Sequence, residues 1–293
     1  MKRPFFSCVI PVKGARPYFD AALESLRLQE MGDDLELIVQ DADVESDEGQ
    51  SDALNIGFAK ARGEWLFWLN ADDVLFPGAL KSVKDYVTSS ESDAGNRRWW
   101  ISGNLVYLDV RGGVLRCTRE RGRARDYAGL PVRVFGPSSF FRREMFEQCG
   151  PFDTTLHYCM DTDMWCRFRE AGYWYDKIPR YLWGFRVHGD SKTSGALKGA
   201  FSSRMREEIE IIRARYCLEP TRLRTFRLRL MRLIDGSTLA SLWDTLRSWG
   251  KDWNEFIKCR YSISALELRS GMGCRILRVS LSRRNWRRDM ILT

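Results

Sequence analysis

The chain has 293 residues, 44% of them hydrophobic and 29% charged, a composition that fits one large or two modest globular domains and excludes a disordered chain. Its net charge of +8 is unevenly spread: residues 196–293 hold 21 Lys and Arg against 10 Asp and Glu, whereas residues 1–195 hold 26 against 29. We therefore expect two parts with different roles, residues 1–195 and residues 196–293.

Strands and helices alternate at the start of the chain. Short apolar runs predict strands at 5–12, 35–41 and 64–73, and helical spacing predicts helices at 17–29, 52–63 and 78–88. This order is typical of a parallel α/β sheet with helices on its faces. Lys2 and Arg3 mimic a signal peptide, but the apolar run after them is short and broken by Pro11. We expect neither a signal peptide nor a spanning helix, because no run approaches about 18 apolar residues.

The middle of the chain changes to paired strands. Two strand-like segments, 99–109 and 113–120, flank Gly112-Gly113 and predict a hairpin. Further elements are predicted as a strand running into a short helix at 138–150, a helix at 160–173 and a final strand at 181–191.

Residues 196–293 are predicted to be mainly helical and basic. Apolar residues share helix faces at Met205, Ile209, Ile212 and Tyr216, and at Leu239, Leu242, Trp243, Leu246, Trp249, Trp253, Phe256 and Ile257. Segment 222–236 (RLRTFRLRLMRLIDG) fits a helix, although its alternation also allows a strand. As a helix it would lie on an anionic membrane surface, or pack its apolar side on the first domain and turn its arginines to water. Its charges suit nucleic-acid phosphates too, but no base-reading module accompanies them, so we expect no nucleic-acid partner.

The eight cysteines are scattered singly, and none forms a C-x-x-C pair. The chain has two histidines, so a structural zinc site is not expected. Isolated thiols of this kind are typical of a reduced, cytosolic protein.

Acidic and amide side chains follow two of the predicted strands. Asp41 ends one, and Asn70, Asp72 and Asp73 end the next, in WLFWLNADD. The carboxyl ends of strands in an open sheet form the ligand-binding edge. The alternative is that these residues serve turns and helix caps, which Asp and Asn favour. Clustered acids would be stabilised by Mg²⁺ or Mn²⁺, which take carboxylates together with substrate phosphates. Neither common phosphate-binding glycine loop is present.

Five segments occur in an order and spacing that together are specific: VIPVKGARPYFDAALESL, LIVQDAD, GQSDALNIGFAKARGEWLFWLNADD, GPSSFFRREMFEQCGPFDTTLHYCMDTDMWCRF and RVHGDS. Over roughly residues 5–192 they resemble a family 2 glycosyltransferase of the GT-A fold. The resemblance implies a Rossmann-like, mixed and mostly parallel sheet flanked by helices, here followed by the basic helical extension.

The resemblance implies a nucleotide-sugar site at the strand ends. Pro11 and Val12 match the end of the first strand beside the nucleotide, and Asp41 matches the acid that reads the nucleotide base. Gln50, Asp52 and Asn55 are candidates to line the nucleotide or donor pocket, although polar residues at a helix start need no such role.

The resemblance also implies which residues bind the metal and which residue acts as the general base. Asn70-Ala71-Asp72 matches the D-x-D motif, whose last acid binds a divalent metal and whose first lies near the ribose. His188 resembles a histidine that completes the metal shell, and Asp161 matches the general base of the "ED" motif. The simpler alternatives are an ordinary hydrogen-bonded His188 and a helix-capping Asp161.

The sequence departs from the family at two places. Asn70 is neutral where the family has an acid, which bears on metal affinity or the ribose contact. The segment after Asp41 also lacks the usual Gly, Ser and Thr, which bears on the base and the donor sugar.

We therefore expect an inverting glycosyltransferase that uses Mg²⁺ or Mn²⁺ and a nucleotide-diphosphate donor, a UDP-sugar before a GDP- or dTDP-sugar. Its acceptor would be a glycan or lipid-linked saccharide, and its place the cytoplasm, with peripheral contact to the inner face of the membrane through residues 220–293. The alternatives are a sugar-phosphate nucleotidyltransferase, a catalytically degenerate nucleotide-sugar-binding protein, and a nucleic-acid binder acting through the tail.

Overall fold

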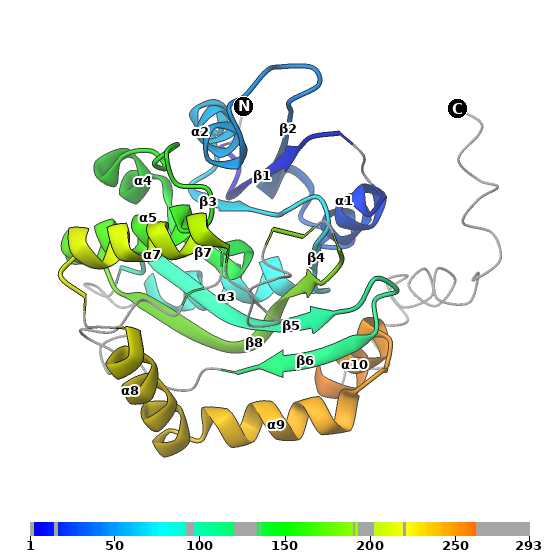
Figure 1. Cartoon of the computed structure of the whole chain (residues 1–293). Helices are drawn as coiled ribbons and strands as arrows, with labels where there is room; N and C mark the ends of the chain where they lie inside the picture. Colours follow the sequence, from blue (N-terminus) through cyan, green and yellow to red (C-terminus); the bar gives the residue numbers. More distant parts are fainter. Residues whose placement is uncertain are drawn as a thin grey trace.

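The structure is a computed structural model that describes residues 3–14, 17–91, 97–119, 134, 136–189, 191–192, 202–218 and 221–261. The fold consists of a mixed sheet covered by helices, with further helices along its last strands (Figure 1). The mixed α/β fold predicted from the sequence is confirmed.

One eight-stranded sheet organises the described residues. Its strands are β1 (Phe6–Val12), β2 (Leu35–Asp41), β3 (Trp65–Trp68), β4 (Val74–Leu75), β5 (Trp100–Leu108), β6 (Val114–Thr118), β7 (Ser139–Arg142) and β8 (Tyr175–Arg186). They run in the order β2-β1-β3-β7-β5-β8-β4, and β6 pairs with β5. β1 is parallel to β2 and β3, and β5 is parallel to β8, whereas the other pairs are antiparallel.

The helices are α1 (Phe19–Arg27), α2 (Gln50–Lys60), α3 (Ala79–Glu91), α4 (Arg143–Cys149), α5 (Met160–Glu170), α7 (Ser203–Arg215), α8 (Thr221–Ile234), α9 (Ser237–Ser248) and α10 (Trp253–Tyr261). Short 3₁₀ turns occur at Gly32–Asp34 and Gly136–Ser138. In the part of the chain that is described, none of these helices has the length and apolar character needed to cross a membrane.

The two faces of β3 belong to two separate cores. Leu66 and Trp68 point into a core shared with α2, α4, α5 and α7, where Trp68 stacks on Trp165 with 5.9 Å between ring centroids. Trp65 and Phe67 point into a second core shared with α1 and α3. Burying each such side chain contributes about 2–3 kcal/mol. Packing on both faces therefore makes β3 a rigid base for the polar turn that follows it.

Two predicted boundaries were wrong. The helix predicted at 52–63 ends at Lys60, and Ala61 is already extended. Gly63 is therefore not a helix cap: a Cβ there would lie 2.5 Å from the Ser7 backbone nitrogen, so glycine is required where the chain passes β1. The last strand begins at Tyr175 and ends at Arg186, instead of spanning 181–191.

The C-terminal helices differ in how they pack against the sheet domain. α7 joins the core beneath α5 through Ile212, and α10 packs Phe256 and Ile257 against β5 and β6. Residues 222–234 of the predicted segment 222–236 are helical, which excludes the strand alternative. Phe226, Leu230, Leu233 and Ile234 of α8 are exposed and Met231 is half-buried, so most of the described apolar side chains of α8 are not packed on the sheet domain.

Candidate functional site

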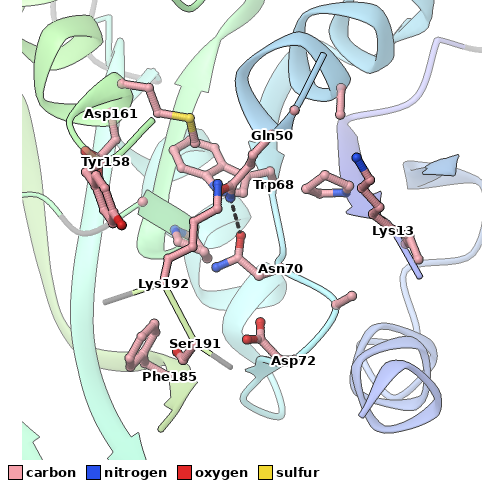
Figure 2. Close-up of a pocket in the computed structure, with 18 of the residues that line it drawn as sticks. Lys13, Gln50, Trp68, Asn70, Asp72, Tyr158, Asp161, Phe185, Ser191 and Lys192 are labelled. Carbon is pink, nitrogen blue, oxygen red and sulfur yellow. Dashed lines mark hydrogen bonds between the residues drawn. The ribbon is translucent and has the colours of Figure 1, made fainter. Parts of the chain in front are cut away.

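A cavity of about 840 Å³ lies beyond the carboxyl ends of β1 and β3 (Figure 2). Its walls come from the loops before α2 and α5 and from the segment after β8. Eight of the predicted site residues line it, namely Pro11, Val12, Gln50, Asn70, Ala71, Asp72, Asp161 and His188. These residues lie far apart in the sequence, and the fold brings them together around one cavity.

Asp72 and His188 form the rim of the cavity. Asp72 lies in the turn after β3, and His188 follows β8 by two residues. Asp72 Oδ2 and His188 Nε2 are 2.9 Å apart. Arg186 Nε donates to the Asp72 carbonyl oxygen at 2.9 Å, and the Tyr18 ring lies 5.2 Å from that of His188. These contacts fix the Asp72 backbone and hold the imidazole against its carboxylate.

The Asn70 amide links the cavity to a buried carboxylate. Its Oδ1 accepts a hydrogen bond from Gln50 Nε2 at 2.9 Å, and its Nδ2 donates to Asp73 Oδ2 at 2.8 Å. Asp73 is fully buried and also accepts the Arg186 backbone N–H at 2.9 Å. Burial, and then the charge of Asp72, raise the pKa of Asp73 well above its ordinary value. An acid at position 70 would set two carboxylates in contact, so asparagine suits this site.

The donor set on the rim fits a hard divalent cation only in part. Asp72 and His188 supply one carboxylate and one imidazole, and no group of three or more His, Cys, Asp or Glu poised for a metal occurs among the described residues. Mg²⁺ and Mn²⁺ commonly take one or two carboxylates and complete their shell with substrate phosphates and water. Asp72 and His188 are therefore sufficient when a diphosphate supplies the remaining ligands.

Asp161 provides a second, separate carboxyl in the cavity, seen across from Asp72 in Figure 2. It lies in the first turn of α5, where its Oδ1 accepts the Thr162 N–H at 2.6 Å and the Thr162 hydroxyl at 3.2 Å. Burial raises the pKa of Asp161 to about 6, although both bonds oppose the shift. A carboxyl with this pKa is ionised at neutral pH and is a better proton acceptor than an ordinary aspartate.

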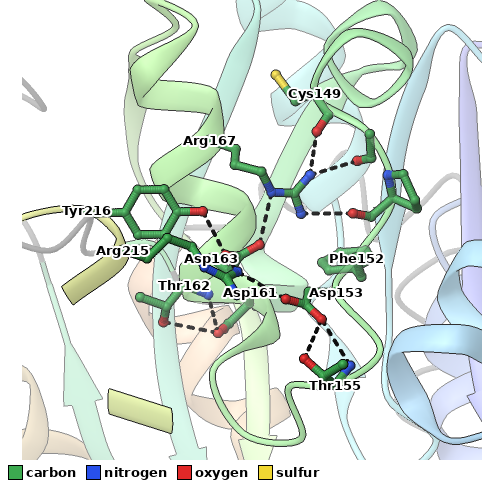
Figure 3. Close-up of polar contacts among 12 residues, drawn as sticks. Cys149, Phe152, Asp153, Thr155, Asp161, Thr162, Asp163, Arg167, Arg215 and Tyr216 are labelled. Carbon is green, nitrogen blue, oxygen red and sulfur yellow. Dashed lines mark hydrogen bonds and ion pairs between the residues drawn. The ribbon is translucent and has the colours of Figure 1, made fainter. Parts of the chain in front are cut away.

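An ion-pair network around the buried Asp163 anchors the helix that carries Asp161 (Figure 3). Asp163, only 1% exposed, accepts from Arg167 Nε at 2.9 Å, Arg215 Nη1 at 2.6 Å and Tyr216 Oη at 2.7 Å. Arg215 also pairs with Asp153 at 3.0 Å, and its hydrogen bonds to Asp153 and Asp163 raise its pKa. Because Arg215 ends α7, this network ties α5 to the C-terminal region.

Glu208 of α7 holds the loop that leads into α5. Its carboxylate accepts the backbone N–H groups of His157 at 2.9 Å, Tyr158 at 2.6 Å and Cys159 at 3.0 Å. Burial alone would raise the pKa of Glu208, but these three donors, with Arg204, lower it below its ordinary value. His157 and Tyr158 line the cavity, so a residue outside the cavity positions part of its wall.

Three predicted residues are not among those lining the cavity. Asn55 bridges the backbone of Phe152, donating to its oxygen at 2.9 Å and accepting from its nitrogen at 2.8 Å. Asp52 accepts the Glu48 N–H at 3.0 Å before α2. Asp41 lies beside Val12 in the β1–β2 register and accepts the Asp43 N–H at 3.1 Å. Asn55 and Asp52 thus make the local contacts that polar residues at a helix start commonly make.

Sequence reasoning did not single out several cavity residues. The clearest is Lys192, whose Nζ donates to Gln50 Oε1 at 3.1 Å and whose pKa is lowered by burial and by Arg204. His157 and Tyr158 also line the cavity. Lys192 follows His188 by four residues, so a positive charge at the same strand exit was the available signal.

Comparison with known proteins finds a family match in the middle of the sheet domain. Residues 42–150 match the model of the family described as glycosyl transferase family 2. A PGL/p-HBAD biosynthesis glycosyltransferase of Mycobacterium bovis is 28% identical over 190 residues, covering 56% of this chain and 69% of that protein. An uncharacterized glycosyltransferase of Rickettsia prowazekii is 23% identical over 220 residues, covering 66% and 67%.

Two solved structures share the fold. The S. aureus TarS fragment 1–349, in complex with UDP-GlcNAc, aligns with a TM-score of 0.52 and 15% identity over 71% of this chain and 65% of that one. The mannosyltransferase PcManGT from Pyrobaculum calidifontis, in complex with GDP-Man and Mn²⁺, aligns with a TM-score of 0.52 and 16% identity over 90% of this chain and 89% of that one. At these identities the likeness establishes the GT-A fold and not the ligand.

Proposed function

We propose that this chain, a glycosyltransferase with a family 2 domain and the GT-A fold, moves one sugar from a nucleoside-diphosphate donor to an acceptor hydroxyl with inversion at the anomeric carbon. One observation carries the proposal. Among the described residues, two of the four carboxyls that line the cavity have different environments: Asp72 is paired with His188 on the rim, and Asp161 has a pKa raised by burial.

Asp161 is the general base in the proposed reaction. It accepts the proton of the acceptor hydroxyl as that oxygen attacks the anomeric carbon and forms the new glycosidic bond. In the same displacement the bond from that carbon to the donor phosphate oxygen breaks, and the nucleoside diphosphate leaves with the electron pair. A single base in one displacement gives inversion. Inversion does not depend on whether a second acid is present on the reacting face.

Asp72 and His188 would hold a divalent cation, Mg²⁺ or Mn²⁺, with the donor diphosphate completing its shell. When bound, the cation neutralises the charge that builds on the leaving diphosphate. Lys192, fixed on Gln50, places a further positive side chain in the same cavity.

The donor we propose is a UDP-sugar, with GDP- and dTDP-sugars as the comparison. TarS in complex with UDP-GlcNAc and PcManGT in complex with GDP-Man support a nucleotide sugar without choosing its base. We propose a glycan or lipid-linked saccharide as acceptor. We also propose a cytoplasmic enzyme whose residues 220–293 contact the inner face of the membrane.

The alternatives have less support. Both named relatives are glycosyltransferases and not nucleotidyltransferases. A catalytically degenerate protein was suggested by Asn70 alone, and the bond from Asn70 to buried Asp73 supports a structural reason for that residue. A nucleic-acid role of the tail has no further observation in its favour.

The test is donor binding followed by product analysis. In a thermal-shift screen with Mn²⁺, one class of nucleotide sugar should raise Tm, and EDTA or Asp72→Asn should abolish the shift, because only ligand bound to the native state stabilises it. Asp85→Asn, on the exposed face of α3, is the matched control. Proton NMR, recorded before the free sugar mutarotates, should then show the sugar released by hydrolysis with inverted anomeric configuration. A shift that persists in EDTA would exclude the metal role, and retained configuration would exclude the single displacement.

A further inference from the structure

Helix α9 is oriented with its polar side inward. Its buried residues are Ser237, Ser241, Asp244, Thr245 and Ser248. Its exposed apolar residues are Leu239, Leu242, Trp243 and Leu246, together with the C-cap Trp249, each between 54% and 68% exposed. The two sets lie on opposite sides of one helix and reverse the usual arrangement of a surface helix. The apolar face of α9 therefore faces outward along most of its length.

Specific hydrogen bonds hold α9 in this orientation. The hydroxyl of Thr245 accepts the Cys117 backbone N–H at 2.9 Å, and that of Ser241 accepts the Arg119 N–H at 2.8 Å, so α9 caps the outer edge of β6. Asp244 accepts from the Tyr181 hydroxyl at 2.7 Å. Rotating α9 to bury its apolar face would leave these buried donors unpaired, which is costly. The outward apolar face is thus a fixed feature of the fold.

Helix α8 adds more apolar surface and positive charge beside α9 (Figure 1). Phe226, Leu230, Leu233 and Ile234 are between 45% and 73% exposed. Residues 221–249 contain six arginines and two acids. One acid, Asp244, is buried, and the other, Asp235, accepts the Ser237 N–H at 2.8 Å. The exposed surface of α8 and α9 is therefore apolar and basic together.

We propose that this surface, the exposed side chains of α8 and α9, is the membrane-docking face and that its partner is an anionic lipid bilayer. The inference rests on the membrane contact proposed above for residues 220–293 and assigns it to one face. Leucines and tryptophans would enter the headgroup and upper acyl region, where Trp is favoured, while the arginines contact anionic headgroups. Arg247, with its guanidinium 5.4 Å from the Trp243 ring centroid, places both functions at one point.

Charge favours an anionic bilayer over two other candidate partners of this surface, which are residues 262–293 of the same chain and a second copy of the chain. Residues 262–293 contain seven arginines and two acids, so they would bring like charge onto the arginines of α8. A second copy of the chain docking through the same face would also set basic helices against each other. An anionic bilayer supplies apolar volume and opposite charge at once.

The experiment is vesicle co-sedimentation of the full chain, with phosphatidylcholine alone or with about one third phosphatidylglycerol. The variant Trp243→Ser/Trp249→Ser removes the two rings, and Leu37→Ser, at a 41% exposed site on the edge strand β2, is the matched control. We expect binding to the anionic vesicles, at least about tenfold weaker in the double variant and unchanged in the control. Donor hydrolysis without vesicles should be equal in all three proteins.

Each other outcome contradicts the proposal in a recognisable way. Equal sedimentation of the double variant would leave membrane contact intact but remove this face from it. No sedimentation of the wild-type protein, together with a dimer that the double variant converts to monomer, would make the face a self-association surface. No sedimentation with a monomeric wild-type protein would remove membrane contact altogether. Because hydrolysis is measured separately, none of these results bears on sugar transfer.

Discussion

Glu208→Gln tests whether α7 positions the cavity wall. The wild-type carboxylate accepts three backbone N–H groups and Arg204 Nε, the last at 3.2 Å. Each hydrogen bond to a charged acceptor contributes about 1.5–3 kcal/mol. The amide removes the charge and turns one acceptor into a donor that faces donors. We expect a loss of about 3 kcal/mol, which lowers Tm by about 6–12 °C in a domain of this size.

The assay pairs thermal unfolding with donor hydrolysis. Glu207→Gln, an exposed neighbour on the same helix, is the control. Because Glu208 holds the loop before Asp161, kcat should fall by about 10–100-fold with a smaller change in KM. The depressed pKa of Glu208 means that its stabilisation is present above its ordinary value of 4.5 and is lost as the pH falls through the folded value. The Tm gap between wild type and variant should therefore narrow in acid.

Equal Tm and equal kcat in Glu208→Gln and Glu207→Gln would refute this account of α7. A large Tm loss with unchanged kcat would leave Glu208 a purely structural residue.

Three further predictions concern the cavity and its support. Asn70→Asp should lower the free energy of unfolding at pH 8 by about 2 kcal/mol, because its carboxylate would meet that of Asp73. The loss should be smaller at pH 5, where protonation relieves the repulsion, and thermal melts of wild type and variant at the two pH values measure the difference. Asp161→Asn should raise the free energy of unfolding at pH 8 by up to about 3 kcal/mol. The raised pKa of Asp161 in the folded state costs the wild type stability as the pH rises from about 4 to 6, and the amide does not ionise. Chemical denaturation of both proteins at pH 8 should show the difference. Asp163→Asn should destabilise by about 3 kcal/mol, because it weakens the bond to Arg215 at the end of α7; an equal urea midpoint would contradict this.

The strand ends were predictable from the sequence because their signal is local. WLFWLNADD combines a run of apolar residues with a polar exit, and the structure makes it β3 followed by the Asn70–Asp73 turn. The parallel pairing of β1 with β2 and β3 brings Val12 and the residues after β3 to one edge of the sheet. Alternation of strands and helices was sufficient to expect that edge.

Contacts between distant segments were not predictable in the same way. Glu208 lies 49 residues or more from the three N–H groups it accepts, and nothing in its own helix marks it. Asn55 is a polar helix residue whether it faces a ligand or, as here, the Phe152 backbone. The orientation of α9 could not be predicted either, because an apolar stripe ordinarily packs inward. Its bonds to Cys117, Arg119 and Tyr181 turn this stripe outward.

Asn70 combines a feature that the local sequence shows with contacts that only the fold shows. Its departure from the D-x-D pattern was visible in the sequence, but its reason was not. The fold places its amide between Gln50 and the buried Asp73, which requires one acceptor and one donor on the same side chain. An aspartate supplies no donor when ionised.

The most direct test of the account is metal-dependent hydrolysis of the donor by Asp161→Asn, with Asp85→Asn as the control. The account predicts that Asp161→Asn lowers kcat by about 10²–10⁴-fold while the donor Kd from thermal shift stays unchanged, because the base acts on the attacking hydroxyl and not on donor binding. Full hydrolysis by Asp161→Asn would show that Asp161 is not the base and would contradict the assignment of the cavity.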